Sequence, residues 1–233
     1  MITVNIAGYP IGIDNKYEHV RLQAEDYLTN EAPIFTVSVS DEEIAAERKK
    51  ASVALSSGYY ESIVSYRKIA ERIPEYDAFL FHGCVIELGD KAYVFTAKSG
   101  VGKTTHTRLW LSEFGEEVSI INGDKPTLRI IDGVPYAAGT PWRGKEGYGK
   151  NAMKRIGGFV FLSRGSENRA FEITPGDAVT RFMSQIYLPE KSAKNLSQTM
   201  RLADKVIRGV KLIHLECNMN PEAAHVCRAA LGV

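Results

Sequence analysis

The sequence predicts an α/β protein built on a mixed β-sheet, preceded by a small N-terminal α+β unit. The first third of the chain combines short strand patterns with helical spacing. From residue 77 onward, β-rich runs arrive in hairpins, and residues 92–121 run strand, glycine loop, helix, strand. Because hairpins pair antiparallel strands and a βαβ unit pairs parallel ones, their combination predicts a mixed sheet.

Composition narrows the class of protein further. The chain has 233 residues, 29 Lys+Arg against 28 Asp+Glu, a formal charge of +1 and 44% hydrophobic residues, as in a globular protein. The near-zero charge argues against nucleic acid as an obligate partner, although a small phosphorylated ligand stays compatible with it. No stretch approaches the ~20 apolar residues of a membrane span, and no signal peptide is recognisable. We therefore expect a cytoplasmic protein with no membrane partner, and its three cysteines fit reduced thiols.

Residues 1–76 are expected to form the first unit. Apolar residues alternate with polar ones in short runs, which is typical of half-buried strands. Ser40-Asp41-Glu42-Glu43 has the capping-box pattern that begins a helix, and Pro74 stops the last helix of the unit. The expected strands are 2–6, 11–13 and 35–39, and the expected helices are 17–27, one beginning near 41, and 60–73.

Residues 77–233 are expected to form the second unit. Gly89-Asp90 and Asp132-Gly133 are tight-turn signals, and each separates two β-rich runs. Thr174-Pro175 and Asn220-Pro221 are typical helix starts, and Arg164 and Asn168 are expected in a hairpin turn. The expected strands are 79–88, 92–96, 118–121, 127–131, 134–138, 159–162, 171–173 and 212–215, and the expected helices end at 114, begin at 175, cover 192–207 and begin at 221.

The strongest functional signal is the glycine loop, residues 97–105, which reads Ala-Lys-Ser-Gly-Val-Gly-Lys-Thr-Thr. A phosphate chain is wrapped by backbone N–H groups, which glycines leave accessible, and the following helix adds its positive N-terminal dipole. Lys103 would supply a cation to the β- and γ-phosphates, and Thr104 a hydroxyl to Mg²⁺. Ala97 stands where the full P-loop signature has glycine, but the strand–loop–helix context favours a phosphate site over a glycine-rich turn without a ligand. The expected phosphate-binding residues are Ser99, Gly100, Val101, Gly102, Lys103, Thr104 and Thr105.

Two further residues are candidates for catalysis. Asp124 follows the buried strand 118–121, where a carboxylate would lie near the metal or near a substrate hydroxyl whose proton must leave. The alternative is an aspartate that caps the turn before Pro126. His82 is expected inside a strand that pairs with the strand leading into the glycine loop, which would bring its imidazole near the phosphate site. From its position alone, packing is the commoner role of such a histidine.

Cationic and metal-ligand side chains complete the set of candidates. Arg143, Lys145 and Lys150 lie in the glycine-rich loop 139–150 and would close over transferred phosphate, or else form a solvated basic loop.

Near the C-terminus, four side chains are of the types that bind zinc. Two of them, His225 and Cys227, lie two positions apart on an expected helix, so their side chains point in directions that differ by about 200°. No zinc site is therefore expected from His214, Cys217, His225 and Cys227.

Three motifs in this order, Phe81-His82-Gly83, Ser99 to Thr104 and Ile121 to Asp124, resemble the HPr kinase/phosphorylase and phosphoenolpyruvate carboxykinase-like P-loop superfamily. Gly102 to Trp110 and Gly139 to Lys145 are similar to a bacterial group of HPr-kinase-like proteins often labelled carboxykinase-like. The resemblance implies a mixed-sheet P-loop kinase core over 77–233, with the N-terminal α+β subdomain over 1–76.

This resemblance also implies roles for single residues. Lys103 and Thr104 would bind phosphates and Mg²⁺, and Asp124 would be the catalytic base and a metal contact. His82 matches the active-site histidine of the family, which reverses the preference for a packing role. Gly123 stands where HPr kinases carry the first aspartate of a pair, and their later glutamate-arginine-glycine signature is not recognisable unless Trp142-Arg143-Gly144 takes its place.

The implied function is a phosphotransferase that moves a phosphoryl group from ATP, or from pyrophosphate, to a hydroxyl of a small molecule or a peptide serine, with Mg²⁺. The N-terminal unit would supply acceptor recognition or the contacts of a homo-oligomer. Two alternatives stay open. One is a nucleotide-binding regulatory module that transfers nothing, consistent with the missing carboxylate at Gly123. The other is an NTPase whose acceptor is water.

Overall fold

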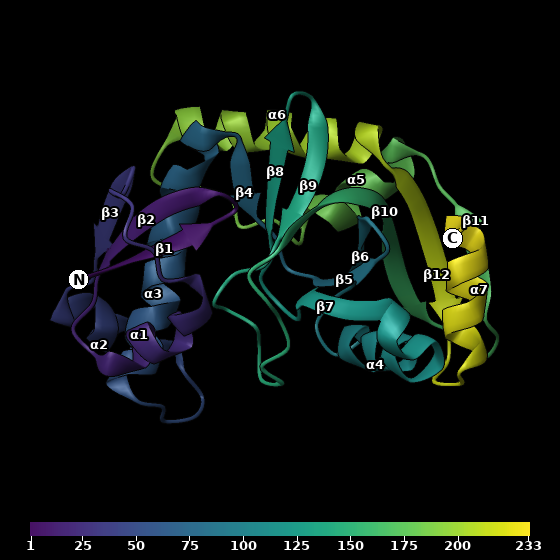
Figure 1. The fold of residues 1–233 in the computed structure, drawn as a ribbon, viewed down its shortest axis with the longest axis horizontal. Helices are drawn as coiled ribbons and strands as arrows, with labels where there is room; N and C mark the ends of the chain where they lie inside the picture. Colours follow the sequence, from purple (N-terminus) through teal and green to yellow (C-terminus); the bar gives the residue numbers. More distant parts are fainter.

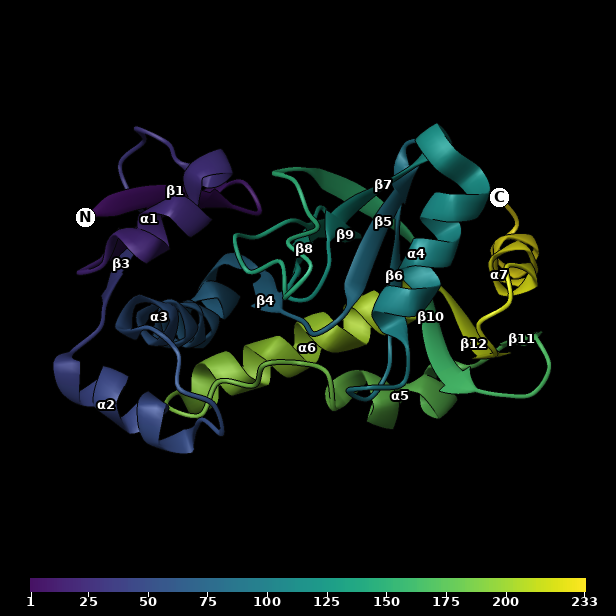
Figure 2. The same cartoon turned by 90° about the horizontal axis from the view of Figure 1, so that it is seen from below.

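The computed structural model describes all 233 residues and is a mixed α/β protein with seven α-helices and two β-sheets. The two termini lie at opposite ends of the long axis of the molecule (Figures 1 and 2). The smaller sheet comes from residues before 40, and the larger sheet from residues after 77. None of the helices combines the length and the hydrophobicity that crossing a bilayer requires.

The small sheet has three strands in the order β1 (Ile2–Ile6), β2 (Tyr9–Asp14) and β3 (Phe35–Ser38), and buried residues of α1 (Glu18–Gln23) and α3 (Ser57–Arg72) pack against it. β1 pairs antiparallel with β2, and β2 pairs parallel with β3. Ser40 caps α2 (Asp41–Lys50) as expected, because its hydroxyl accepts a hydrogen bond from Glu43 N while the Glu43 carboxylate accepts one from Ser40 N.

The large sheet has nine strands, and its central part is parallel. The long strand β10 pairs parallel with β6 on one side and with β12 on the other, while the remaining pairs are antiparallel. The expectation of a mixed sheet is therefore confirmed. The strands are β4 (Ala78–Leu80), β5 (Cys84–Leu88), β6 (Lys91–Thr96), β7 (Val118–Asn122), β8 (Thr127–Ile131), β9 (Val134–Ala138), β10 (Met153–Arg164), β11 (Arg169–Glu172) and β12 (Lys211–Cys217).

Helices cover both faces of the large sheet (Figure 2). On one face, α5 and α6 bury Phe182 and Leu202 against sheet residues such as Phe159. On the other face, α4 and α7 bury Trp110 and Cys227 against a second set of sheet residues. This three-layer packing is typical of α/β proteins, because each face of a central sheet is apolar and must be covered. The helices are α4 (Lys103–Phe114), α5 (Pro175–Met183), α6 (Ala193–Gly209) and α7 (Glu222–Leu231).

The expectation of one continuous strand over 79–88 was wrong. The chain leaves β4, which pairs with β8, and crosses residues 81–83 to β5, which pairs with β6 and β7. His82 therefore lies in a crossing segment and not within a strand. Its backbone N–H donates to Gln185 O at 2.8 Å, and that of Gly83 donates to Asp124 O at 3.0 Å, so the segment is fixed next to the end of β7.

The apolar core around the small sheet extends into the large one. Ala138 and Trp142, from the second unit, pack in the same buried cluster as β1, β2 and α3. The expected helix over 17–27 is shorter than its apolar spacing indicates, because α1 is followed by a 3₁₀ turn over Glu25–Tyr27. The division at residue 76 stays a prediction.

Candidate functional site

A cleft of about 640 Å³ lies between α3 and the edge of the large sheet where the glycine loop begins. In Figure 1, α3 stands on one side of it and α4 on the other. Most of the predicted site residues line this cleft, whereas Val101 lines a neighbouring cavity and Lys150 lines neither. The residues in the cleft wall are Ser99, Gly100, Gly102, Lys103, Thr104, Thr105, His82, Asp124 and Arg143.

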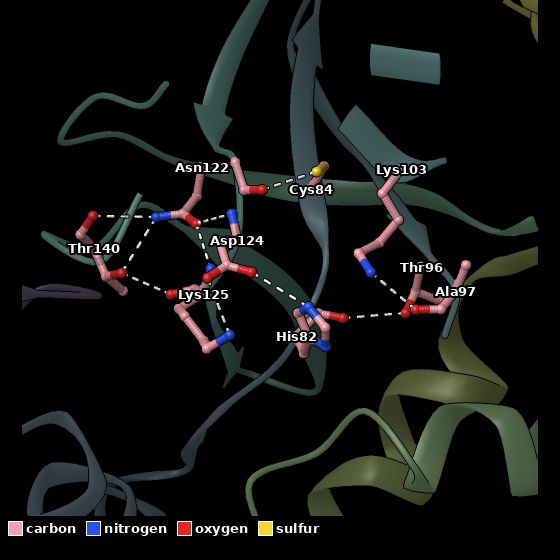
Figure 3. Close-up of polar contacts among 10 residues, drawn as sticks. His82, Cys84, Thr96, Ala97, Lys103, Asn122, Asp124, Lys125 and Thr140 are labelled. Carbon is pink, nitrogen blue, oxygen red and sulfur yellow. Dashed lines mark hydrogen bonds and ion pairs between the residues drawn. The ribbon is translucent and has the colours of Figure 1, made fainter. Parts of the chain in front are cut away.

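The glycine loop connects β6 to α4, and both of its glycines have backbone angles that other residues rarely adopt. Gly100 has φ +79° and Gly102 has φ +130°, although a Cβ at either position would meet open space. The conformation, and not crowding, therefore requires glycine here. Lys103 Nζ donates to Ala97 O at 2.9 Å, so the ammonium lies over the loop (Figure 3). Burial lowers the pKa of Lys103, while Cys84 and Asp124 act in the opposite direction.

Asp124 follows β7 in a turn that another side chain stabilises. Asn122 is fully buried, and its Oδ1 accepts hydrogen bonds from the backbone N–H of Asp124 at 2.9 Å and of Lys125 at 2.7 Å (Figure 3). Thr140 fixes Asn122 in turn, because Asn122 Nδ2 donates to Thr140 O at 3.1 Å. The turn is capped by Asn122 and not by Asp124, which leaves the Asp124 carboxylate facing the cleft. Asn122 was not predicted as a positioning residue, although the Asn-Gly pair after a buried strand is a signal for such a turn.

The Asp124 carboxylate contacts one group on each oxygen. His82 Nε2 lies 3.3 Å from Oδ1, and Lys125 Nζ lies 3.0 Å from Oδ2 (Figure 3). Burial raises the pKa of Asp124, but the hydrogen bond from His82 and the charge of Lys125 outweigh it and hold the pKa below its ordinary value. The carboxylate is therefore ionised at neutral pH and able to accept a proton or a hydrogen bond from a molecule in the cleft.

Gly123 lies under the 139–150 loop. A Cβ at this position would lie 2.9 Å from Arg143 O, closer than real Cβ atoms come, and 3.3 Å from Tyr148 O, which is also a tight contact. Gly123 N donates to Tyr148 O at 3.0 Å, and Cys84 Sγ donates to Gly123 O at 2.9 Å. The space that an acidic side chain would occupy at position 123 is thus filled by the backbone of the loop.

The 139–150 loop is anchored to the N-terminal unit. Trp142 is buried, and its Nε1 donates to Ser62 O at 3.1 Å and to Ser62 Oγ at 2.9 Å. Its ring packs edge-on against Tyr66, with centroids 5.6 Å apart. Asn151 Nδ2 donates to Asp26 O at 3.1 Å, just beyond the loop. Helix α3 therefore sets the position of a segment that lies directly over Gly123.

Two of the three predicted cationic clamps pair with carboxylates that do not line the cleft. The Arg143 guanidinium forms an ion pair with Asp26 and lies 5.3 Å from the centroid of the Tyr27 ring. Lys150 Nζ lies 2.5 Å from Glu87 Oε2. Lys145 is in the cleft wall. A catalytic role for Arg143 stays a prediction.

Removing the Trp142 anchor is expected to destabilise the fold. Trp142→Phe keeps the packing but loses the Nε1 donor, which should lower the free energy of unfolding by about 1 kcal/mol. Trp142→Ala also leaves a cavity and should cost about 3–5 kcal/mol. Urea unfolding measures both, with Phe171→Ala as the control because Phe171 is half exposed. A Trp142→Ala variant that is as stable as this control would contradict the inference that Trp142 anchors the loop.

Glu87, which pairs with Lys150 at the end of the 139–150 loop, should make the free energy of unfolding depend on pH. Burial raises the pKa of Glu87, but hydrogen bonds from Lys150 and Lys154 outweigh this and lower the pKa from 4.5 to about 2. Because the folded pKa lies below the unfolded one, this stabilisation is present above pH 4.5 and disappears as the pH falls through about 2. Glu87→Gln should therefore lower the free energy of unfolding by about 1 kcal/mol at pH 7.

Urea titrations of wild type and Glu87→Gln at pH 7, 5, 4 and 3 test this expectation, with Glu31→Gln as the exposed control. The difference between wild type and Glu87→Gln should shrink between pH 5 and pH 3. A difference that stays constant over this range would show that the charge of Glu87 does not carry the effect.

The C-terminal histidines and cysteines do not gather at one point. His214 Nε2 lies 2.8 Å from Ser163 Oγ, and His225 Nε2 lies 3.0 Å from Glu113 Oε2. Cys227 is fully buried against Trp110 in the α4–α7 core. No group of three or more His, Cys, Asp or Glu side chains in the structure is placed to hold a metal ion by itself.

The fold and the cleft define a mixed α/β protein in which a glycine loop with a lysine lies near an ionised carboxylate paired with histidine. Among solved structures, the chain is similar to the Hpr(Ser) kinase/phosphatase from Coxiella burnetii. The TM-score is 0.38 and the identity 7%, over 66% of this chain and 88% of that chain. No protein-family model matches the sequence, and no curated protein matches it.

Proposed function

We propose that the protein is a P-loop phosphotransferase that moves the terminal phosphoryl group of ATP or pyrophosphate to a hydroxyl of a small molecule or a peptide serine, with Mg²⁺. One observation carries the proposal. A single cleft contains the glycine loop with Lys103 and the Asp124 carboxylate paired with His82. Phosphoryl transfer to a hydroxyl needs a cradle for phosphate and a proton acceptor in reach of the attacking oxygen, and the glycine loop and the Asp124 carboxylate have the chemistry for these two parts.

The chain's own residues would divide the reaction between them. The backbone N–H groups of the glycine loop and the Lys103 ammonium would hold the donor phosphates. Asp124 would take the proton of the acceptor hydroxyl as its oxygen bonds to the terminal phosphorus, while the bond from that phosphorus to the bridging oxygen breaks. His82 would hold the carboxylate by its hydrogen bond to Oδ1. Most of the acceleration would come from positioning and charge neutralisation.

The residues present fit Mg²⁺ held jointly with phosphate. Mg²⁺ is usually bound through one or two carboxylates together with substrate phosphates, so it needs no cluster of protein ligands. Thr104 and Asp124 are both in the cleft wall and would hold it. When bound, it would neutralise charge on the phosphates.

The N-terminal unit would recognise the acceptor. Helix α3 contributes Tyr59, Ser62, Ile63 and Tyr66 to the wall of the cleft, away from the glycine loop. These side chains offer hydroxyl groups and apolar surface, which suits a polar molecule with some apolar surface.

The test is transfer of labelled phosphate from ATP, and separately from pyrophosphate, to a panel of polyols, hydroxy amino acids and serine peptides with Mg²⁺. Wild type, Lys103→Ala and the exposed control Lys205→Ala are compared. A labelled product that depends on the acceptor and on Lys103 supports the proposal. Donor binding without any product supports the regulatory module, and release of labelled phosphate without an acceptor supports the NTPase; both outcomes contradict the proposed transferase.

A further inference from the structure

A smaller pocket of about 260 Å³ lies beside the cleft, on the side away from the glycine loop. Tyr66, His82 and Lys125 line both the pocket and the cleft, so the two spaces share a wall. His82 and Lys125 also contact the Asp124 carboxylate, which places the pocket next to the proposed base (Figure 3). The other residues in its wall are Leu80, Phe81, Ser184, Gln185, Ile186 and Tyr187.

The back of the pocket is fixed by the pairing of two segments. Phe81 pairs with Ile186 in an antiparallel bridge, and His82 N donates to Gln185 O at 2.8 Å. Phe81 and Ile186 are both buried. The pocket is therefore a recess with packed residues behind it. Its volume is roughly that of nine water molecules in the liquid, which suits part or all of a small molecule.

The charge of the pocket wall favours an anionic group. Lys125 is the one lysine or arginine in this wall, and no carboxylate lines the pocket. Lys125 Nζ lies 3.0 Å from Asp124 Oδ2, and an ammonium has three N–H donors, so it can bind a second anionic group as well. Burial raises the pKa of Tyr187 to about 12, so its hydroxyl is a further donor at neutral pH.

A buried hydrogen-bond acceptor in the pocket wall has no partner. Gln185 is 9% exposed, its Nε2 donates to Ser184 Oγ at 3.0 Å, and its Oε1 is buried without a hydrogen bond. The orientation of this amide is fixed, because the Ser184 hydroxyl donates its only proton to Arg181 O at 2.8 Å and can only accept from Gln185. Buried acceptors are nearly always paired, and a hydroxyl of a ligand would satisfy Oε1.

We propose that this pocket holds the non-reacting end of the acceptor, and that the acceptor is a small hydroxy acid with its carboxylate at Lys125 and an uncharged hydroxyl at Gln185. This inference rests on the proposed function, because it names the acceptor of the same site. The reacting hydroxyl would lose its proton to Asp124 and take the phosphoryl group, and the remaining donor phosphate would leave. Because Lys125 contacts Asp124, the carboxylate and the reacting hydroxyl must lie only a few bonds apart.

Two related classes of acceptor fit the pocket less well. A hydroxy amino acid carries an ammonium, which would lie near Lys125 with no carboxylate in the pocket wall to balance it. A serine within a peptide has chain on both sides, whereas the pocket is small and has buried residues behind it.

Initial rates of phosphoryl transfer to matched acceptors, from MgATP or magnesium pyrophosphate, test this inference. Glycerate is compared with glycerol, and gluconate with sorbitol, because each pair differs only in a carboxylate. Serine replaces the 2-hydroxyl of glycerate by an ammonium, and 3-hydroxypropionate lacks that hydroxyl. The wild-type kcat/KM should be on the order of tenfold or more higher for the hydroxy acid in each comparison. Equal or faster transfer to glycerol, sorbitol, serine or a serine peptide would overturn the inference and support the proposed function.

Two variants assign the preference to the pocket. Lys125→Met keeps the length of the side chain and should remove the preference for glycerate over glycerol. This ratio cancels any effect on Asp124, because the same base serves both acceptors. Gln185→Met should remove the preference for glycerate over 3-hydroxypropionate. Lys205→Met is the exposed control and should leave both ratios as in wild type. Unchanged ratios in Lys125→Met and Gln185→Met would overturn the inference.

Calorimetry with glycerate and gluconate separates failure of this inference from failure of the proposed function. Binding of these acids that depends on Lys125, without any transfer, would contradict the proposed function and retain the hydroxy-acid pocket. Transfer to other acceptors, without binding of the acids, would overturn the pocket and retain the transferase. Neither binding nor transfer would overturn both.

Discussion

Replacing Asp124 with asparagine is expected to lower the rate of phosphoryl transfer by about 10²- to 10⁴-fold. Asparagine has the same shape and still accepts a hydrogen bond, but it does not take up the proton of the acceptor hydroxyl. The turn should survive, because Asn122 Oδ1 binds the backbone N–H of residue 124 and not its side chain. The fold and the glycine loop are therefore preserved, and the loss should fall on kcat.

Initial rates with the acceptor found in the transfer assay measure this effect, and calorimetry measures donor binding. Asp90→Asn is the matched control, because Asp90 lies in the tight turn between β5 and β6 on the exposed side of the hairpin. Donor affinity should change by no more than a few-fold in Asp124→Asn. A variant that transfers phosphate at the wild-type rate would exclude Asp124 as the base.

His82→Gln extends this reasoning to the partner of Asp124. Glutamine keeps a donor for Asp124 Oδ1 but removes the imidazole, which lies 3.3 Å from that oxygen. If His82 acts by orienting the carboxylate, this variant should retain much more activity than His82→Ala. Equal loss in both variants would indicate that the imidazole itself takes part in the reaction.

The local motifs of the glycine loop were predictable, because strand, loop and helix follow one another within thirty residues or so and each has its own signal. The crossing of the chain at His82, from β4 to β5, was not predictable. Residues 79–88 form an unbroken apolar run, and the break depends on β4 and β5 pairing with different strands of the sheet. Gly83 was the indication in the sequence that the strand is interrupted, because a glycine inside a strand pattern often marks a close backbone approach. In the structure, a Cβ at this position would lie 2.9 Å from Phe95 O.

The partners of Arg143 and Trp142 could not be predicted from the sequence either. Asp26 and Ser62 lie far from them along the chain, and nothing in the local pattern distinguishes an arginine that faces phosphate from one that pairs with the N-terminal unit. The same holds for Gly123, because the residues that crowd it come from a loop about twenty positions later. Contacts of this kind depend on the packed arrangement of the two units.

Restoring an acidic residue at position 123 is expected to damage the protein. Gly123→Asp matches the aspartate pair of the family that the motifs resemble, but its Cβ would lie 2.9 Å from Arg143 O, in backbone that Trp142 holds against α3. Accommodating it should cost about 1–3 kcal/mol of stability. The loop must also move, and Gly144, which lies against the Asp124 side chain, moves with it.

Displacement of this loop should lower the transfer rate by about 10²-fold, because misplacement of a site by about 1 Å has effects of that size. Gly123→Ala separates crowding from charge, since it adds the same Cβ without a carboxylate and should lose activity to a similar extent. Gly176→Ala is the control, because a Cβ there meets only Thr174 Oγ1 at 3.6 Å. Urea unfolding and initial rates give both readouts. If Gly123→Asp gained activity while Gly123→Ala lost it, a second carboxylate would fit the site, and the packing of the 139–150 loop on Gly123 would not be required for transfer.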